Sequence, residues 1–171
     1  MKTLNLLLTS SVLGLSLVSG TAFAAGEDCP ECKDCIMVAD LNVEFKNDST
    51  VYMNDSERKE VAEFADFLKK TDLYAVIEGH TSKFATAPYN YKLSSDRANK
   101  VRAELIKLGV RSSQIKSLGF GESSPLYDNN TDEGAQKNRR VIAEVFNTAD
   151  ELSQYISSES KRIQNIKFKE Q

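Results

Sequence analysis

The sequence predicts an α/β fold, an α+β sandwich in which one sheet of about four strands carries helices on one face, followed by an extra C-terminal helix. Two observations lead to this expectation. Short apolar segments that suit strands alternate with longer segments whose apolar residues recur every three or four positions, as on an amphipathic helix. Most strand-like segments also end in polar or glycine-containing motifs. Alternation of this kind is typical of a sheet covered by its connecting helices, and the strand ends are where such a sheet presents binding groups.

Residues 1–24 have the features of a secretory signal peptide. Lys2 provides the positive start, a short apolar segment follows, and Ala22-Phe23-Ala24 fits a signal-peptidase site. The mature chain is therefore expected to begin at Ala25, with an uncleaved anchor as the alternative. No lipidation motif precedes Cys29, and no second apolar segment of the sequence is long enough to span a membrane.

Residues 25–40 are predicted to form a tether that contains all three cysteines, Cys29, Cys32 and Cys35. Secretion would place them in an oxidising compartment, where an odd number leaves one thiol for an intermolecular bridge and hence a homodimer. A zinc site would need a fourth ligand, and His80 is the only histidine of the chain. Neither a metal nor another cofactor is therefore expected.

The main domain is predicted over residues 41–146. Leu41–Phe45 alternates apolar and polar residues, as a half-buried strand does. A helix is expected to start near Asn54, with Glu57 three residues later as in a capping box. Its apolar stripe consists of Val61, Phe64, Ala65 and Leu68.

Three further strands are predicted over residues 74–77, 115–120 and 141–146. A second long helix is expected to start with Ser94 as its N-cap and to end at Gly109. The loop Asn129–Asp132 should cap a short third helix.

Residues 147–171 are predicted to form an amphipathic helix. Thr148 and Glu151 have the spacing of a capping box. The apolar stripe consists of Ala149, Leu152, Ile156, Ile163 and Ile166. This helix could pack on its own domain, or its spacing could serve association with a partner or a second copy.

Four motif blocks follow one another along the main domain: Gly79-His80-Thr81-Ser82; Asn90 with Leu93-Ser94-x-x-Arg97-Ala98; Gly119 to Pro125; and Asn138-Arg139-Arg140-Val141. Their order and spacing resemble the OmpA-like family, the C-terminal domains of OmpA, MotB and Pal, from about Leu41 to Phe146. The resemblance implies a βαβαβ-type sheet and a non-catalytic protein of the periplasm, associated with the cell wall or outer membrane. It implies peptidoglycan and envelope proteins as partners.

The resemblance also assigns a binding site for the diaminopimelate of the peptidoglycan stem peptide, whose side chain ends in a carboxylate and an ammonium. Arg97, expected in the first turn of its helix, would bind the carboxylate with its planar fork. Asn90 would be a pocket amide, and Arg139 or Arg140 a flanking cation. The candidate ligand-binding residues are Thr81, Ser82, Asn90, Leu93, Arg97, Arg139 and Arg140.

Ser82 departs from the family pattern, which has an aspartate directly after Gly-His-Thr to hold the ammonium. A hydroxyl in place of a carboxylate weakens that contact by about 1–2 kcal/mol, or roughly tenfold in affinity. Glu78 and Asp96 are nearby acids that could compensate. Two hypotheses follow: a wall-binding module with a weakened ammonium subsite, or an adaptor with the same fold that binds protein partners.

Charge and composition narrow the remaining functions. Removing Lys2 with the signal leaves 21 basic and 25 acidic residues, a net charge of −4 (21 − 25), without a basic cluster that would suit nucleic acid. No serine or cysteine nucleophile with a matching base is visible, so an enzyme is not expected and His80 is interpreted as structural.

Overall fold

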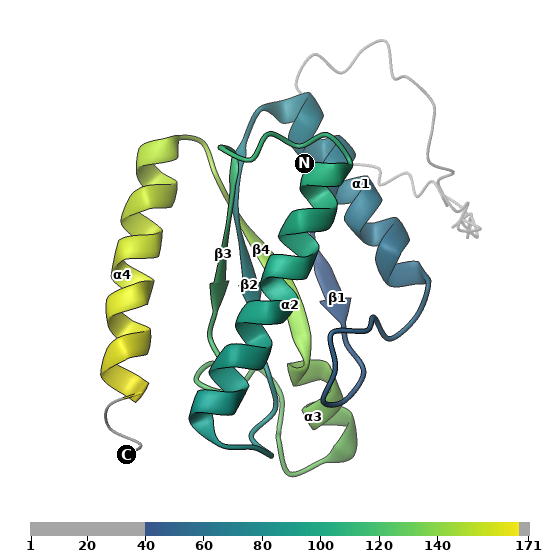
Figure 1. Ribbon diagram of the computed structural model, residues 1–171, viewed down its shortest axis with the longest axis vertical. Coiled ribbons are helices and arrows are strands. Elements are labelled where there is room, and N and C mark those ends of the chain that lie inside the picture. The colour runs from purple at the N-terminus through teal and green to yellow at the C-terminus, as the bar shows by residue number, and fades with distance from the viewer. Residues whose placement is uncertain (1–39, 168–171) are drawn as a thin grey trace, which may run out of the picture. The chain divides into compact units, whose positions relative to one another are not determined.

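The structure of the protein, a computed structural model, describes residues 40–167 (Figure 1). The signal peptide, the three cysteines, nearly all of the tether and the last four residues lie outside this range. The elements are β1 (Asn42–Glu44), α1 (Ser56–Thr71), β2 (Tyr74–Gly79), α2 (Ala87–Lys107), β3 (Ile115–Gly119), α3 (Asp132–Asn138), β4 (Arg140–Phe146) and α4 (Ala149–Lys167). The predicted α/β class is confirmed, with four strands in one sheet.

The sheet has the strand order β1-β4-β2-β3. Strands β2 and β3 are parallel, whereas β4 runs antiparallel to both β1 and β2. Gly79 at the end of β2 is paired with Gly119 at the end of β3 and with Val141 near the start of β4. The three motif blocks that adjoin these strands therefore meet at one end of the sheet, as expected from the sequence.

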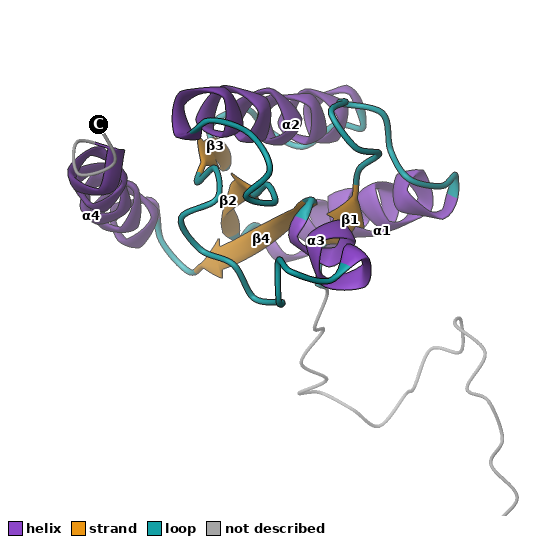
Figure 2. Ribbon diagram, turned by 90° about the horizontal axis from the view of Figure 1, so that it is seen from below, coloured by secondary structure: helices purple, strands orange, loops and turns teal. Residues whose placement is uncertain are grey.

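Helices α1 and α2 pack on one face of the sheet and form the main core with it (Figure 2). The predicted stripe of α1 is fully buried there, together with Val101 and Leu105 of α2. They meet the strand residues Val43, Ala75, Ile77 and Val141, which project to the same side. Burying each large aliphatic or aromatic side chain contributes about 1.5–3 kcal/mol, so this layer fixes the positions of α1 and α2.

Helix α4 packs on the other face of the sheet. Glu78 alternates with the core residues of β2 and so projects to that other face, where it accepts a hydrogen bond from Tyr155 Oη of α4 at 2.6 Å. Leu152 and Ile163 of α4 are buried, and Tyr155 packs against Phe146 of β4. We call the α4 face the set Glu78, His80, Phe120, Phe146, Tyr155 and Arg162. The extra C-terminal helix thus packs on its own domain. Separately, no helix of the described range is long and apolar enough to cross a membrane.

The start of α2 was placed wrongly from the sequence. The helix begins at Ala87, with Thr86 at the N-cap and Pro88 in the first turn, rather than at Ser94. Proline suits the first turn because its missing N–H would be unpaired there. Arg97 is therefore the eleventh residue of α2, about three turns from its start rather than in the first turn, and its own N–H is not among the free N–H groups of the helix N-terminus.

The other caps differ less from expectation. Helix α1 begins at Ser56, and Glu57 accepts a hydrogen bond from Glu44 N at 2.9 Å instead of closing a capping box. Thr131 caps α3 by accepting from Gly134 N at 3.0 Å. Thr148 accepts from Glu151 N at 3.2 Å, as the capping motif of α4 predicted.

Candidate functional site

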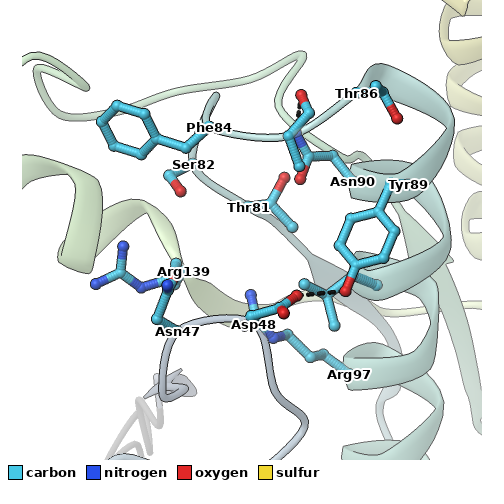
Figure 3. A pocket seen from close by; sticks show the side chains of 12 residues that line it. Asn47, Asp48, Thr81, Ser82, Phe84, Thr86, Tyr89, Asn90, Arg97 and Arg139 are labelled. Atoms are coloured by element: carbon cyan, nitrogen blue, oxygen red, sulfur yellow. Dashed lines mark hydrogen bonds between the residues drawn. The ribbon is translucent and has the colours of Figure 1, made fainter.

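A pocket of about 610 Å³ opens at the end of the sheet where the motif blocks meet (Figure 3). Its walls come from the β1–α1 loop, the β2–α2 loop, the first three turns of α2 and the residue that follows α3. The lining residues are Asn47, Asp48, Thr81, Ser82, Phe84, Ala85, Thr86, Tyr89, Asn90, Leu93, Arg97 and Arg139. Six of the seven candidate residues named from the sequence are thus brought together, and Arg140 is not among them.

Two local features bring α2 close to the strand ends. A side chain at Gly79 would collide with the backbone of Ser94, so only glycine allows this close approach. Ser94 is not an N-cap. Its hydroxyl accepts a hydrogen bond from Gly121 N at 2.9 Å and donates to Tyr91 O at 2.8 Å. These contacts hold α2, and with it Arg97, against the end of the sheet.

The side chain of Arg97 is fully buried at the base of the pocket. Its guanidinium donates to Ser49 O at 2.8 Å, Lys46 O at 3.0 Å and His80 O at 3.4 Å, and it lies over the ring of Phe45. Burial, and then the charge of Arg139, lower its pKa to about 10, so it remains cationic at neutral pH.

Arg97 forms no ion pair with an acidic residue of the described range, although the charge of Asp48 acts on it from further away. Among residues 40–167, no carboxylate lies within ion-pairing distance of its guanidinium, although it carries five N–H donors and uses three in these bonds. A buried charge that no counter-ion contacts is costly, and a ligand carboxylate would relieve that cost.

Thr81 and Ser82 follow β2 and lie in the middle of the pocket wall (Figure 3). The backbone of Thr81 is fixed because its N–H donates to Gly121 O at 2.8 Å. Thr81 is 3% exposed, yet its hydroxyl has no partner within the described chain. Buried hydroxyls normally find a partner, so this group is available to a bound molecule.

Asn90 and Leu93 face the pocket from α2. The amide nitrogen of Asn90 donates to Ala85 O at 3.1 Å and to the carboxylate of Glu122. This nitrogen is therefore occupied in holding the β2–α2 loop. Leu93 contributes apolar wall.

Arg139 lines the pocket and Arg140 does not, a distinction that the sequence left open. Arg139 directly follows α3, and its Nε donates to Gln136 Oε1 at 3.1 Å. Arg140 is buried on the opposite side of β4, where its guanidinium donates to Ser124 O at 3.3 Å. Burial lowers the pKa of both guanidiniums.

The nearby acids considered from the sequence also lie elsewhere. Glu78 belongs to the α4 face, and Asp96 pairs with Lys92 on the surface at 2.6 Å. The pocket instead contains Asp48, whose carboxylate accepts a hydrogen bond from Tyr89 Oη across the pocket (Figure 3). Asp48 has a φ of 49°, a left-handed conformation that aspartate tolerates better than most residues.

Sequence reasoning missed Asp48 and Tyr89, as well as Asn47, Phe84, Ala85 and Thr86. The position of Asn47 and Asp48 shortly after the first strand was a usable signal, because Thr81 and Ser82 also come shortly after a strand. No group of three His, Cys, Asp or Glu side chains within the described part of the chain could hold a metal ion.

Comparisons with known proteins match this region. The family model for the OmpA family matches residues 44–139. The chain is 39% identical over 119 residues to outer membrane porin F of Pseudomonas aeruginosa, a match that covers 68% of this chain. It covers only 33% of that porin, so the chain spans about a third of this relative's length.

Solved structures agree with the fold. The peptidoglycan-associated lipoprotein from Burkholderia pseudomallei superposes with a TM-score of 0.56 and 28% identity, over 61% of this chain and 87% of that one. The cell wall anchor of the T6SS from Pseudomonas aeruginosa gives a TM-score of 0.55 and 26% identity, over 64% and 81% of the two chains.

Proposed function

This chain belongs to the OmpA family, and from that premise we propose that it is a non-catalytic peptidoglycan-binding protein of the cell envelope. It would reside in the periplasm, next to the cell wall or outer membrane, and anchor an envelope assembly to the wall. Two proteins of similar structure support this proposal, since one is a peptidoglycan-associated lipoprotein and the other is a cell wall anchor.

The proposal rests on one observation: Arg97 is buried and forms no ion pair within the described structure. Its guanidinium is held by three backbone carbonyls at the base of an open pocket, with no described carboxylate in ion-pairing range. We assign it to the side-chain carboxylate of diaminopimelate in the stem peptide. A charge-assisted hydrogen bond of this kind contributes about 1.5–3 kcal/mol, and the planar guanidinium fits both carboxylate oxygens.

The other pocket groups complete a peptide-binding site. The Thr81 hydroxyl can donate to the same carboxylate, and Arg139 places a second cation at the pocket wall. Leu93 and Phe84 offer apolar surface to the methylene groups of the ligand side chain. Because Phe84 is 66% exposed, its ring can gain burial when a ligand binds.

Sedimentation with purified sacculi tests the proposal. The wild type should pellet, and a free tripeptide containing diaminopimelate should release it. Arg97→Lys keeps the charge but loses the planar fork, so binding should fall about tenfold or more. Arg139→Ala should weaken binding by a smaller factor. Arg97→Ala is a poor test because it would leave three carbonyls without their donor and lower stability.

Arg111→Ala is the matched control, since Arg111 is exposed, pairs with Asp72 at 2.8 Å and does not line the pocket. It should pellet like the wild type. Equal pelleting of Arg97→Lys, Arg139→Ala and wild type would show that the pocket is not the wall-binding site. A wild type that stays in the supernatant would favour the adaptor function, which the neutral Ser82 also favours.

A further inference from the structure

The charges that line the pocket are unequal. Arg97 and Arg139 provide two guanidiniums, and Asp48 is the one carboxylate among the twelve lining residues. Ser82 provides only a hydroxyl. A zwitterionic side chain brings one negative and one positive group, so a pocket built for it should offer a free anion as well as a free cation.

The single carboxylate of the pocket already has a partner. Asp48 accepts the hydroxyl proton of Tyr89, and this hydrogen bond raises the pKa of the Tyr89 hydroxyl. A ligand ammonium would have to compete with Tyr89 for Asp48. It would also feel the nearby positive charge of Arg97, on whose pKa Asp48 and Arg139 both act.

The opposite end of the pocket is no better suited to a cation. Ser82 and Arg139 both line the pocket and appear on the same side of Thr81 in Figure 3, so an ammonium that binds the Ser82 hydroxyl would share this side of the pocket with a guanidinium. The Thr81 hydroxyl lines the same pocket as the two arginines, is buried and has no partner in the described structure. In a pocket that contains two guanidiniums, this hydroxyl is better placed to donate to an anion than to accept from an ammonium.

We propose that the pocket selects its ligand by the carboxylate alone and does not require the ammonium. The ligand class is then a stem peptide whose third residue ends in a carboxylate, with or without an amino group on the same carbon. This inference rests on the proposed function, and it assigns Ser82 and the Tyr89–Asp48 pair as the groups that set the specificity.

Three synthetic tripeptides separate the two ends of the ligand. They share L-Ala-γ-D-Glu and differ in the third residue, which is meso-diaminopimelate, 2-aminopimelate (distal carboxylate only) or L-lysine (distal ammonium only). By calorimetry, the aminopimelate peptide should bind the wild type within about threefold of the diaminopimelate peptide. The lysine peptide should bind at least about tenfold more weakly, the effect of losing one charge-assisted hydrogen bond.

Ser82→Asp should restore the missing anion. The affinity for the diaminopimelate peptide should rise by about tenfold, and that for the aminopimelate peptide should fall, since a second carboxylate now faces its own. The gain should shrink at high salt because a partly exposed ion pair is screened. Ser112→Asp adds the same charge at an exposed position outside the pocket and should leave the three affinities as in the wild type.

The outcomes are distinct. A wild type that binds the diaminopimelate peptide tenfold or more tightly than the aminopimelate peptide overturns this inference and leaves the proposed function intact. Equal affinity for the lysine and aminopimelate peptides also overturns it. If none of the three binds at millimolar concentration, the proposed function fails and this inference fails with it.

Discussion

Arg97 and Glu78 are both buried charged side chains on the same domain, yet their surroundings differ. Glu78 lies on the α4 face, where Tyr155 donates to it at 2.6 Å and His80 Nε2 lies 3.7 Å away, under the cover of a helix. Within the described structure, the hydrogen bonds of the Arg97 side chain go only to backbone carbonyls, and Arg97 borders an open pocket. A buried charged group that is paired with other groups of its own chain indicates a structural role. A buried charged group that faces an open cavity indicates a role in ligand binding.

The largest expected effect is a loss of stability when the packing of α4 on the sheet is weakened. Leu152 of α4 is 2% exposed, so Leu152→Ala should lower the free energy of unfolding by about 2–5 kcal/mol, measured by urea denaturation. Gln154→Ala on the exposed side of α4 is the control and should change stability by less than about 0.5 kcal/mol. If both variants are as stable as the wild type, α4 does not pack on the sheet in solution, and association with a partner becomes the better interpretation of its apolar stripe.

The next effect concerns the buried carboxylate itself. Tyr155→Phe removes the hydroxyl that donates to Glu78 and leaves a buried charge short of a donor. The expected loss of stability is about 1–3 kcal/mol. In the double variant Tyr155→Phe, Glu78→Gln, the second change should cost less than Glu78→Gln alone, because the two groups interact directly. Strict additivity of the two losses would mean that this hydrogen bond contributes nothing.

A smaller effect, which depends on pH, is expected from His80 on the α4 face: its titration should change the stability of the domain. Its ring stacks on Phe120, neither ring nitrogen has a hydrogen-bond partner in the described structure, and burial lowers its pKa. The charges around it are Glu78, which opposes this shift, and Arg140 and Arg162, which add to it. An unfolded histidine titrates near about 6.5, so below that pH the unfolded state binds more protons and stability falls as the pH falls.

His80→Phe keeps the stacked ring but removes the titration. Between pH 7 and 5.5 the wild type should lose up to about 1 kcal/mol more stability than this variant does. Comparing the two proteins cancels the opposite contribution of Glu57 and Glu144, whose pKa values burial raises. Parallel stability profiles for the two proteins would show that His80 is protonated to the same extent in the folded and unfolded states.

Local features of the fold could be predicted from the sequence, whereas features that depend on element boundaries could not. The strands and the stripe of α1 follow from apolar periodicity, which is a local property. The start of α2 was missed because Leu93, Ser94 and Asp96 resemble a helix start, whereas Thr86 and Pro88 mark the real one. Whether Arg139 or Arg140 enters the pocket depends on where α3 ends and β4 begins, and helix boundaries are poorly encoded.

The Tyr89–Asp48 pair was beyond sequence reasoning for a different reason. Its two residues are 41 positions apart and belong to α2 and the β1–α1 loop. Their contact exists only because the packing of α2 and the left-handed backbone at Asp48 bring them together. The site was therefore predictable where one motif carried it, and not where two separate elements meet.

The smallest effect is expected at that pair, and it bears directly on the pocket. Tyr89→Phe removes the hydroxyl that occupies Asp48 and frees its carboxylate for a ligand ammonium. The Tyr89 hydroxyl is exposed enough to exchange this bond for one with water, so freeing Asp48 should be worth only about 0.5–1 kcal/mol, and the diaminopimelate tripeptide should bind a few times more tightly to the variant. The aminopimelate tripeptide lacks the ammonium, and its affinity should not increase. Because Tyr89 is 45% exposed, stability should change little. If instead both tripeptides bind more weakly to Tyr89→Phe, the Tyr89 hydroxyl contacts the ligand itself, and Asp48 is not the group it restrains.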